Sequence, residues 1–178
     1  MKMKKSIIYA LCSMLFVVAA QATTTTMPLV GFYRTVDDST NKSKAIVRLY
    51  ECGENLCGRV VALFDKETGT TIEETIKNPG RRAEKVNGTP HVDGLDIIWG
   101  MSWDARRSEF SGGRIMDPED GRTYRARIWA NPNDPTLLNV RGMIGPFGRT
   151  QVWHAVATAD LHPDLKNLDT SGWTPVTR

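Results

Sequence analysis

Residues 109–155 read EFSGGRIMDPEDGRTYRARIWANPNDPTLLNVRGMIGPFGRTQVWHA, and this stretch decides the fold. Turn-forming residues cluster at 117–121, 131–135 and 145–148, and an earlier cluster lies at 104–107. The centres of the clusters are roughly 13–14 residues apart, slightly more than the spacing in most all-β sandwiches. Between the clusters lie segments rich in β-branched and aromatic residues. The pattern predicts an antiparallel meander of long strands, which suits the tilted wall of a closed barrel.

Working outward from this stretch, we expect eight strands in the chain. The clearest alternation is Tyr124–Trp129, where Tyr124 and Ile128 share one face with Ala126. The expected strands are Leu29–Thr35, Lys44–Glu51, Gly58–Phe64, Gly94–Ser102, Ser108–Met116, Arg122–Ala130, Thr136–Met143 and Arg149–Ala157. The predicted fold is therefore all-β, an eight-stranded antiparallel up-and-down barrel with one long connection and a short helix.

The long connection is Asp65–Asp93. A capping box at Thr71–Glu74 predicts one or two helical turns that run to Lys77 and stop before Pro79. A connection of this length in a single domain is usually a lid, a binding loop or a partly ordered segment. The C-terminal residues 161–178 form either a short helix around Pro163–Leu168 or an extended strap.

The N-terminus has the pattern of an export signal. Three lysines precede an apolar segment, Ile7–Ala20, and Ala20-Gln21-Ala22 is a small-x-small cleavage site. The apolar segment is short for a bilayer-spanning helix, although an uncleaved anchor remains the alternative. We expect cleavage after Ala22, delivery to a bacterial periplasm or the medium, and no transmembrane segment in the mature chain.

Removal of residues 1–22 changes the charge of the protein. The leader holds three of the 23 Lys and Arg residues and none of the 20 Asp and Glu residues, so the mature chain is electrically neutral. A neutral domain offers no electrostatic footprint for nucleic acid. The mature residues 23–178 are enough for one domain with its own core.

The mature chain has two cysteines, Cys52 and Cys57. An even count in an exported protein indicates one disulfide, here across the end of a hairpin, with free thiols as the alternative. The spacing is not that of a C-x-x-C redox motif, and no second pair is present for a zinc site.

Several sequence blocks together resemble the DUF2147 family of bacterial exported proteins, from Gly31 to about Val156. They are Gly31-Phe-Tyr33, Leu56–Val61, Asn78-Pro79, Gly94-Leu95, Gly113–Tyr124, Val140–Gly145 and Gly148–Trp153. The resemblance implies a lipocalin-like barrel and no assigned activity. It also implies that Arg149 packs over the first-strand aromatic Tyr33. The stretch Gly80–Gly88 is longer and more basic than the family pattern.

No motif points to catalysis or to a metal. The carboxylates of 117–121 lack the spacing of a calcium loop and fit a hairpin turn. The three histidines, His91, His154 and His162, lack the partners of a metal site, and there is no nucleophile elbow. We predict no catalytic residues, no metal and no cofactor, although a hydrolase with a site assembled from distant residues stays open.

The candidate ligand-binding residues are cationic or aromatic side chains on strand faces. Arg48 and Arg141 lie in apolar strands; an inward arginine would pair or hold an anion, and an outward one would be solvated. Aromatic side chains at a barrel mouth can bind amphipathic ligands, with burial in the core as the alternative for each tryptophan. The predicted set is Arg48, Trp99, Tyr124, Arg141 and Trp153.

These expectations lead to one functional hypothesis and one alternative. The hypothesis is non-catalytic binding of a small apolar or amphipathic molecule in the barrel, under the Asp65–Asp93 connection as a lid. The alternative is a packed barrel that acts through its surface on another envelope protein. Because fold does not fix function, the hypothesis rests on analogy.

Overall fold

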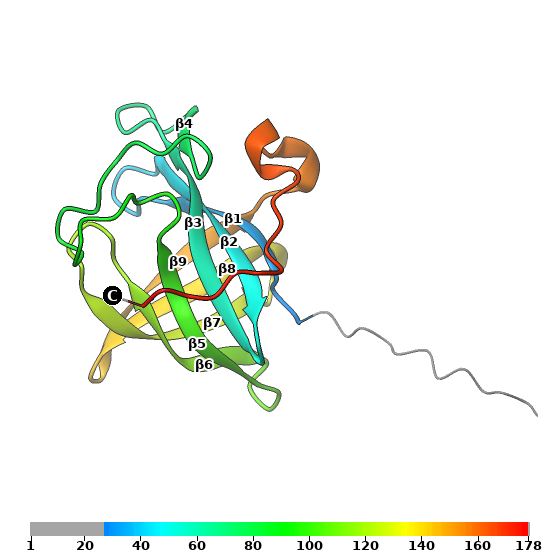
Figure 1. Cartoon of the computed structure of the whole chain (residues 1–178). Helices are drawn as coiled ribbons and strands as arrows, with labels where there is room; N and C mark the ends of the chain where they lie inside the picture. Colours follow the sequence, from blue (N-terminus) through cyan, green and yellow to red (C-terminus); the bar gives the residue numbers. More distant parts are fainter. Residues whose placement is uncertain (1–26, 178) are drawn as a thin grey trace, which may run out of the picture.

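Strand pairing closes most of the sheet on itself in the computed structural model, which describes residues 27–177 (Figure 1). The strands are β1 (Gly31–Val36), β2 (Ser43–Cys52), β3 (Asn55–Phe64), β4 (Ile72–Thr75), β5 (Asp96–Asp104), β6 (Glu109–Met116), β7 (Thr123–Asn131), β8 (Asp134–Ile144) and β9 (Phe147–Ala155). All neighbouring strands are antiparallel. The barrel closes where β1 pairs with both β2 and β9, and β3 pairs with β2 and β5. The predicted eight-stranded barrel is confirmed, and each expected strand lies within three residues of the observed one.

The turns use the chemistry that the sequence predicted. At the β6–β7 turn the Asp117 carboxylate accepts a hydrogen bond from the backbone N–H of Glu119 at 2.8 Å, and Gly121 has a φ of +73°. Only glycine adopts this backbone conformation without strain. The same type of aspartate or asparagine turn recurs at Asp37 and Asn131.

The predicted helical turns after Thr71 are wrong, because residues 72–75 form β4. This short strand pairs with the free edge of β3, and the backbone N–H of Ile76 donates to the carbonyl of Val61 at 2.9 Å. Ile72 and Ile76 pack on the outer side of the barrel. An available strand edge and β-branched side chains outweigh the local capping pattern.

The barrel interior is a packed hydrophobic core. Every wall strand contributes buried side chains to it, among them Leu49, Leu56, Ile98, Phe110, Ile128, Val140 and Trp153. Two residues of the long connection, Ala83 and Val86, are buried in the same cluster. The connection therefore plugs the end of the barrel from which it emerges.

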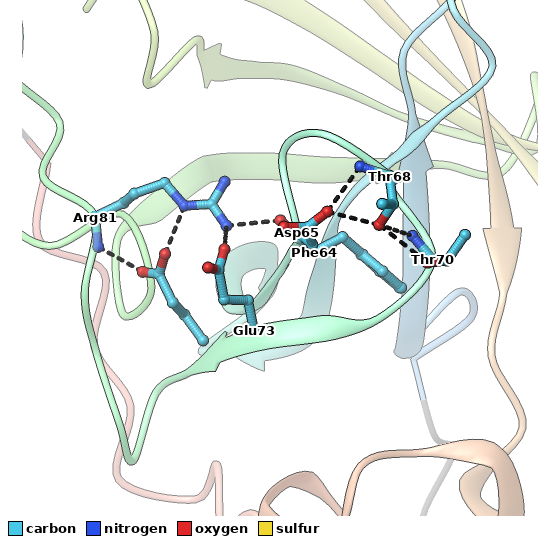
Figure 2. A network of polar contacts seen from close by, with 7 residues as sticks. Phe64, Asp65, Thr68, Thr70, Glu73 and Arg81 are labelled. Atoms are coloured by element: carbon cyan, nitrogen blue, oxygen red, sulfur yellow. Dashed lines mark hydrogen bonds and ion pairs between the residues drawn. The ribbon is translucent and has the colours of Figure 1, made fainter.

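The connection is tied back to the barrel by Arg81, as Figure 2 shows. Its Nε donates to Glu74 Oε1 at 2.6 Å, its Nη2 donates to the Phe64 carbonyl at 2.6 Å, and the same Nη2 lies 3.2 Å from Glu73 Oε2. Burial would raise the pKa of Glu74, but the hydrogen bonds from Arg81 outweigh burial and lower it. The basic stretch Gly80–Gly88 thus supplies a clamp for the connection.

The C-terminal residues form a strap on the outside of the barrel, shown in orange and red in Figure 1. Two 3-10 turns, Thr158–Asp160 and Pro163–Leu165, place Leu161 and Leu165 in an outer hydrophobic cluster with Ile46 and Val61. The strap then turns back, so that Trp173 packs edge-on against Tyr50. The sequence left a short helix or a strap open, and the structure has both.

The predicted disulfide is confirmed. Cys52 and Cys57 are bonded, with their Cα atoms 5.9 Å apart, across the β2–β3 hairpin. Within residues 27–177 no helix is long and apolar enough to cross a bilayer. The expected signal peptide, residues 1–22, lies outside the described residues.

Candidate functional site

The structure does not bring the five predicted ligand-binding residues together. Trp153 lies in the lumen, only 2% exposed, and its Nε1 donates to Gln151 Oε1 at 3.4 Å. Trp99 is half-buried against the lumenal core. The Tyr124 hydroxyl donates to Asp120 Oδ2 at 3.3 Å near the β6–β7 turn. These three aromatic side chains serve packing and turn contacts at separate places.

The two arginines of the predicted set lie on the outer face of the wall. The Arg48 guanidinium is 4.6 Å from the centroid of the Phe32 ring, and burial lowers its pKa. Arg141 Nη1 donates to Thr150 Oγ1 at 3.1 Å. Side chains alternate along each strand between the lumenal face and the outer face. The sequence neighbours of each arginine point into the lumen, so the arginine points outward.

The expected stacking of Arg149 on Tyr33 is wrong. Arg149 Nη2 lies 2.5 Å from Asp38 Oδ2 in the β1–β2 turn, whereas Tyr33 pairs in register with Ala155. Arg149 and Tyr33 therefore belong to opposite ends of the barrel.

Two hollows stand out on the molecule, and neither is enclosed by the barrel. One, of about 510 Å³, is a shallow depression beside Trp103 at the β5–β6 hairpin. The other, of about 300 Å³, lies where the long connection returns to β5. Its wall includes Arg59, His91, Asp93, Leu95, Asp96 and Val176. The second hollow is the candidate site, because it combines apolar and buried charged groups.

Asp93 is the most unusual residue of the candidate site. The residue is 4% exposed, and neither carboxylate oxygen makes a hydrogen bond of good geometry among the described residues. Burial raises its pKa and the nearby Glu74 carboxylate adds to the effect, while the backbone N–H groups of Asp93 itself and of Gly80, together with His91, oppose it. The buried Nδ1 of His91 also lacks a partner within residues 27–177. Buried polar atoms are normally satisfied, so these two groups single out the hollow as the candidate site.

A second buried carboxylate, Asp96, fixes the opposite wall. Arg59 binds it with two hydrogen bonds of 2.9 and 2.8 Å, and the Tyr50 hydroxyl donates to it at 2.8 Å. The backbone N–H of Val176 also donates to Asp96, at 2.9 Å. Burial raises the pKa of Tyr50, and Asp96 raises it further. The salt bridge thus holds the strap as the rim of the hollow, and the Arg59 guanidinium lies 4.3 Å from the Trp173 ring.

The chemistry available at the hollow is that of a binding site. Asp93 offers two acceptor oxygens, or a donor and an acceptor when protonated. Among residues 27–177 no group of three His, Cys, Asp or Glu side chains is placed to hold a metal ion. Asp96 and Arg59 neutralise each other. An amine or hydroxyl group of a small molecule would satisfy Asp93 where the protein does not.

No sequence pattern points to this site. In the sequence His91 is a lone histidine, and Asp93 belongs to an Asp-Gly turn before β5. Burial is what distinguishes Asp93 from other aspartates in turns. That burial depends on how the connection folds, so it cannot be read from the sequence.

Comparisons with known proteins point to one family and one fold. A sequence model of the family described as "Uncharacterized protein conserved in bacteria (DUF2147)" matches residues 31–155. Among solved structures, protein HP1028 from Helicobacter pylori, described as belonging to the lipocalin family, superposes with a TM-score of 0.57 at 18% identity. The match covers 74% of this chain and 85% of that chain. No curated protein matches the chain.

Proposed function

The chain belongs to the DUF2147 family of bacterial proteins, and we propose that it is an exported, non-catalytic binding protein for a small amphipathic molecule. The lipocalin-like fold is compatible with binding a small ligand. We place the ligand in the hollow between the connection and the strap, and not in the lumen, because the hydrophobic core fills the lumen.

One observation carries the proposal: Asp93 lines a hollow of about 300 Å³, and within residues 27–177 neither oxygen of its buried carboxyl makes a well-formed hydrogen bond. Leaving a buried carboxyl unsatisfied costs about 1–3 kcal/mol or more. A ligand that donates to Asp93 would recover this free energy on binding. The free energy of unfolding would then be higher with the ligand bound than without it.

The walls of the hollow suggest the chemistry of the ligand. Asp93 and His91 form a polar side that suits an amine or hydroxyl group. Pro90, Leu95 and Val176 supply an apolar side. A volume of about 300 Å³ is at the lower end of ligand pockets, which suits a small molecule.

Native mass spectrometry of the protein purified from the periplasm tests the proposal. We expect a small adduct on the unmodified protein, and its loss in Asp93→Leu, which removes both acceptor oxygens. The matched control is Glu84→Gln, which changes an exposed carboxylate of the same connection. The same sample tests export, because cleavage after Ala22 leaves Thr23 as the first residue.

An adduct retained by Asp93→Leu would contradict the proposed site. A protein recovered only from the cytoplasm, with residues 1–22 attached, would contradict export. Each result overturns a different part of the proposal.

The packed lumen favours a second function, in which the barrel acts through its surface. This alternative needs no small ligand. It predicts that the protein carries no adduct and instead binds another component of the envelope.

A further inference from the structure

The β8–β9 hairpin ends in an exposed apolar pair. Ile144 and Phe147 face each other across the Gly145-Pro146 turn. Ile144 is 64% exposed and Phe147 is 80% exposed. A single exposed apolar side chain is ordinary, but two paired at the end of a hairpin form a small apolar tip. In Figure 1 this hairpin, drawn in yellow to orange, projects from the barrel.

Three arginines lie close to the tip on the outer face of the sheet, whereas Ile144 and Phe147 continue the face of the lumenal residues beyond the end of the barrel. Arg125 Nη2 donates to the Gly145 carbonyl at 3.3 Å, and Arg141 donates to Thr150 of the facing strand. Arg114 pairs in register with Arg125. Among residues 27–177 none of these three arginines forms an ion pair with a carboxylate. Their charge is free for a partner outside the chain.

Few carboxylates lie on the strands that carry this surface. β6 to β9 contain two, Glu109 and Asp134, and Asp134 is at the far end of β8 from the tip. Glu109 is bound by Arg127 through hydrogen bonds of 3.0 Å from Nε to both carboxylate oxygens. The neighbouring β6–β7 turn carries three carboxylates. Glu119 lies 2.5 Å from Lys44 Nζ, Asp120 lies 3.8 Å from Arg122 Nε, and Asp117 forms no ion pair within residues 27–177.

We propose that the β8–β9 tip and the arginines Arg114, Arg125 and Arg141 form a docking surface for an anionic lipid bilayer. Ile144 and Phe147 insert among the headgroups, and the guanidinium groups bind headgroup phosphates. The stems of arginines also pack well at the boundary between apolar and polar regions. A protein partner would need a broad interface, whereas the exposed apolar area here is a convex tip of two side chains. The chain would thus sit on a membrane surface although its mature form is electrically neutral overall.

Co-sedimentation with vesicles tests the proposal. We expect the mature protein to bind phosphatidylglycerol-containing vesicles and to bind pure phosphatidylcholine vesicles much more weakly. Ile144→Ser with Phe147→Ser should weaken binding by at least about tenfold, because two apolar side chains no longer leave water. Each of Arg114→Gln, Arg125→Gln and Arg141→Gln should weaken it about fivefold. Salt at about 0.5 M should release most of the protein, because the Debye length is then only a few Å.

Control variants lie at the opposite end of the barrel. Trp103→Ser removes another exposed aromatic, and Arg106→Gln removes another exposed arginine, both at the β5–β6 hairpin. They should leave vesicle binding unchanged, and circular dichroism should show all variants folded. Equal loss of binding in these controls, or full binding by the Ile144/Phe147 double variant, would overturn the proposal. Release by soluble glycerol phosphate without any dependence on the tip would also overturn it, because it would identify a phosphate site instead of a bilayer surface.

Discussion

At the residue scale, Asp93 makes the free energy of unfolding depend on pH. Its pKa is raised in the folded protein, so the folded state binds more protons than the unfolded state between the two pKa values. The free energy of unfolding therefore falls as the pH rises through this range. At neutral pH the Asp93 carboxylate destabilises the fold.

We therefore predict that Asp93→Asn stabilises the ligand-free protein at pH 7, by about 1 kcal/mol or more. The gain should shrink as the pH is lowered below the pKa of an ordinary aspartate, where Asp93 is protonated in both states. Urea unfolding curves at several pH values measure it. Glu84→Gln, at an exposed position, should show no such trend. A gain independent of pH would show that charge burial is not the cause.

The disulfide gives a second prediction at this scale. Replacing Cys52 and Cys57 by serine should lower the free energy of unfolding by about 2 kcal/mol, since the closed loop is short. Thermal unfolding of the oxidised and the double-serine protein measures the difference. No change in the midpoint would mean that the β2–β3 hairpin holds its end without the bond.

Individual residues were the hardest to predict from the sequence. Arg48 lies outside the barrel because strand alternation places it there, but the sequence did not say which face of β2 is lumenal. The disulfide was predictable because it closes a local loop. Asp93, Arg59 and Asp96 form a site only because the connection and the strap fold against β3 and β5. Contacts between such distant segments leave no pattern in a single sequence.

At the scale of elements, the meander was predictable because each turn and each alternation is local. β4 was missed because its strand form depends on the free edge of β3, about ten residues away in the chain. For the same reason, the sequence could not decide between a short helix and a strap for residues 161–178. Its order depends on Trp173 and on the Asp96 salt bridge, not on any helical pattern of its own.

We predict that Trp173→Ala loosens the strap while the barrel stays folded. The substitution removes the contacts of the indole with Tyr50 and Arg59, and we expect a loss of about 2–3 kcal/mol from a half-buried tryptophan. Limited proteolysis should then cleave the C-terminal residues first, at Lys166 for trypsin. Equal protease resistance of the two proteins would contradict this role. Thr177→Ala, at an exposed position of the strap, is the control.

At the scale of the whole molecule, the lipocalin-like barrel encloses a solid core. Side chains from all eight wall strands and a plug from the connection share one cluster. A lipocalin-like fold therefore does not bring a lumenal ligand with it, and the proposed binding site is the hollow at Asp93, outside the wall.

This view predicts that the lumen excludes apolar molecules until a large side chain is removed. Trp153→Ala should destabilise the protein by about 3–5 kcal/mol and leave a dry cavity. Xenon or benzene should bind this variant and not the unmodified protein, as observed by crystallography under xenon pressure or by chemical-shift changes of lumenal methyl groups. Val152→Ala, on the outer face next to Trp153, should bind neither gas nor benzene. Binding of benzene by the unmodified protein would show that the core opens, and would return the lumen to the list of ligand sites.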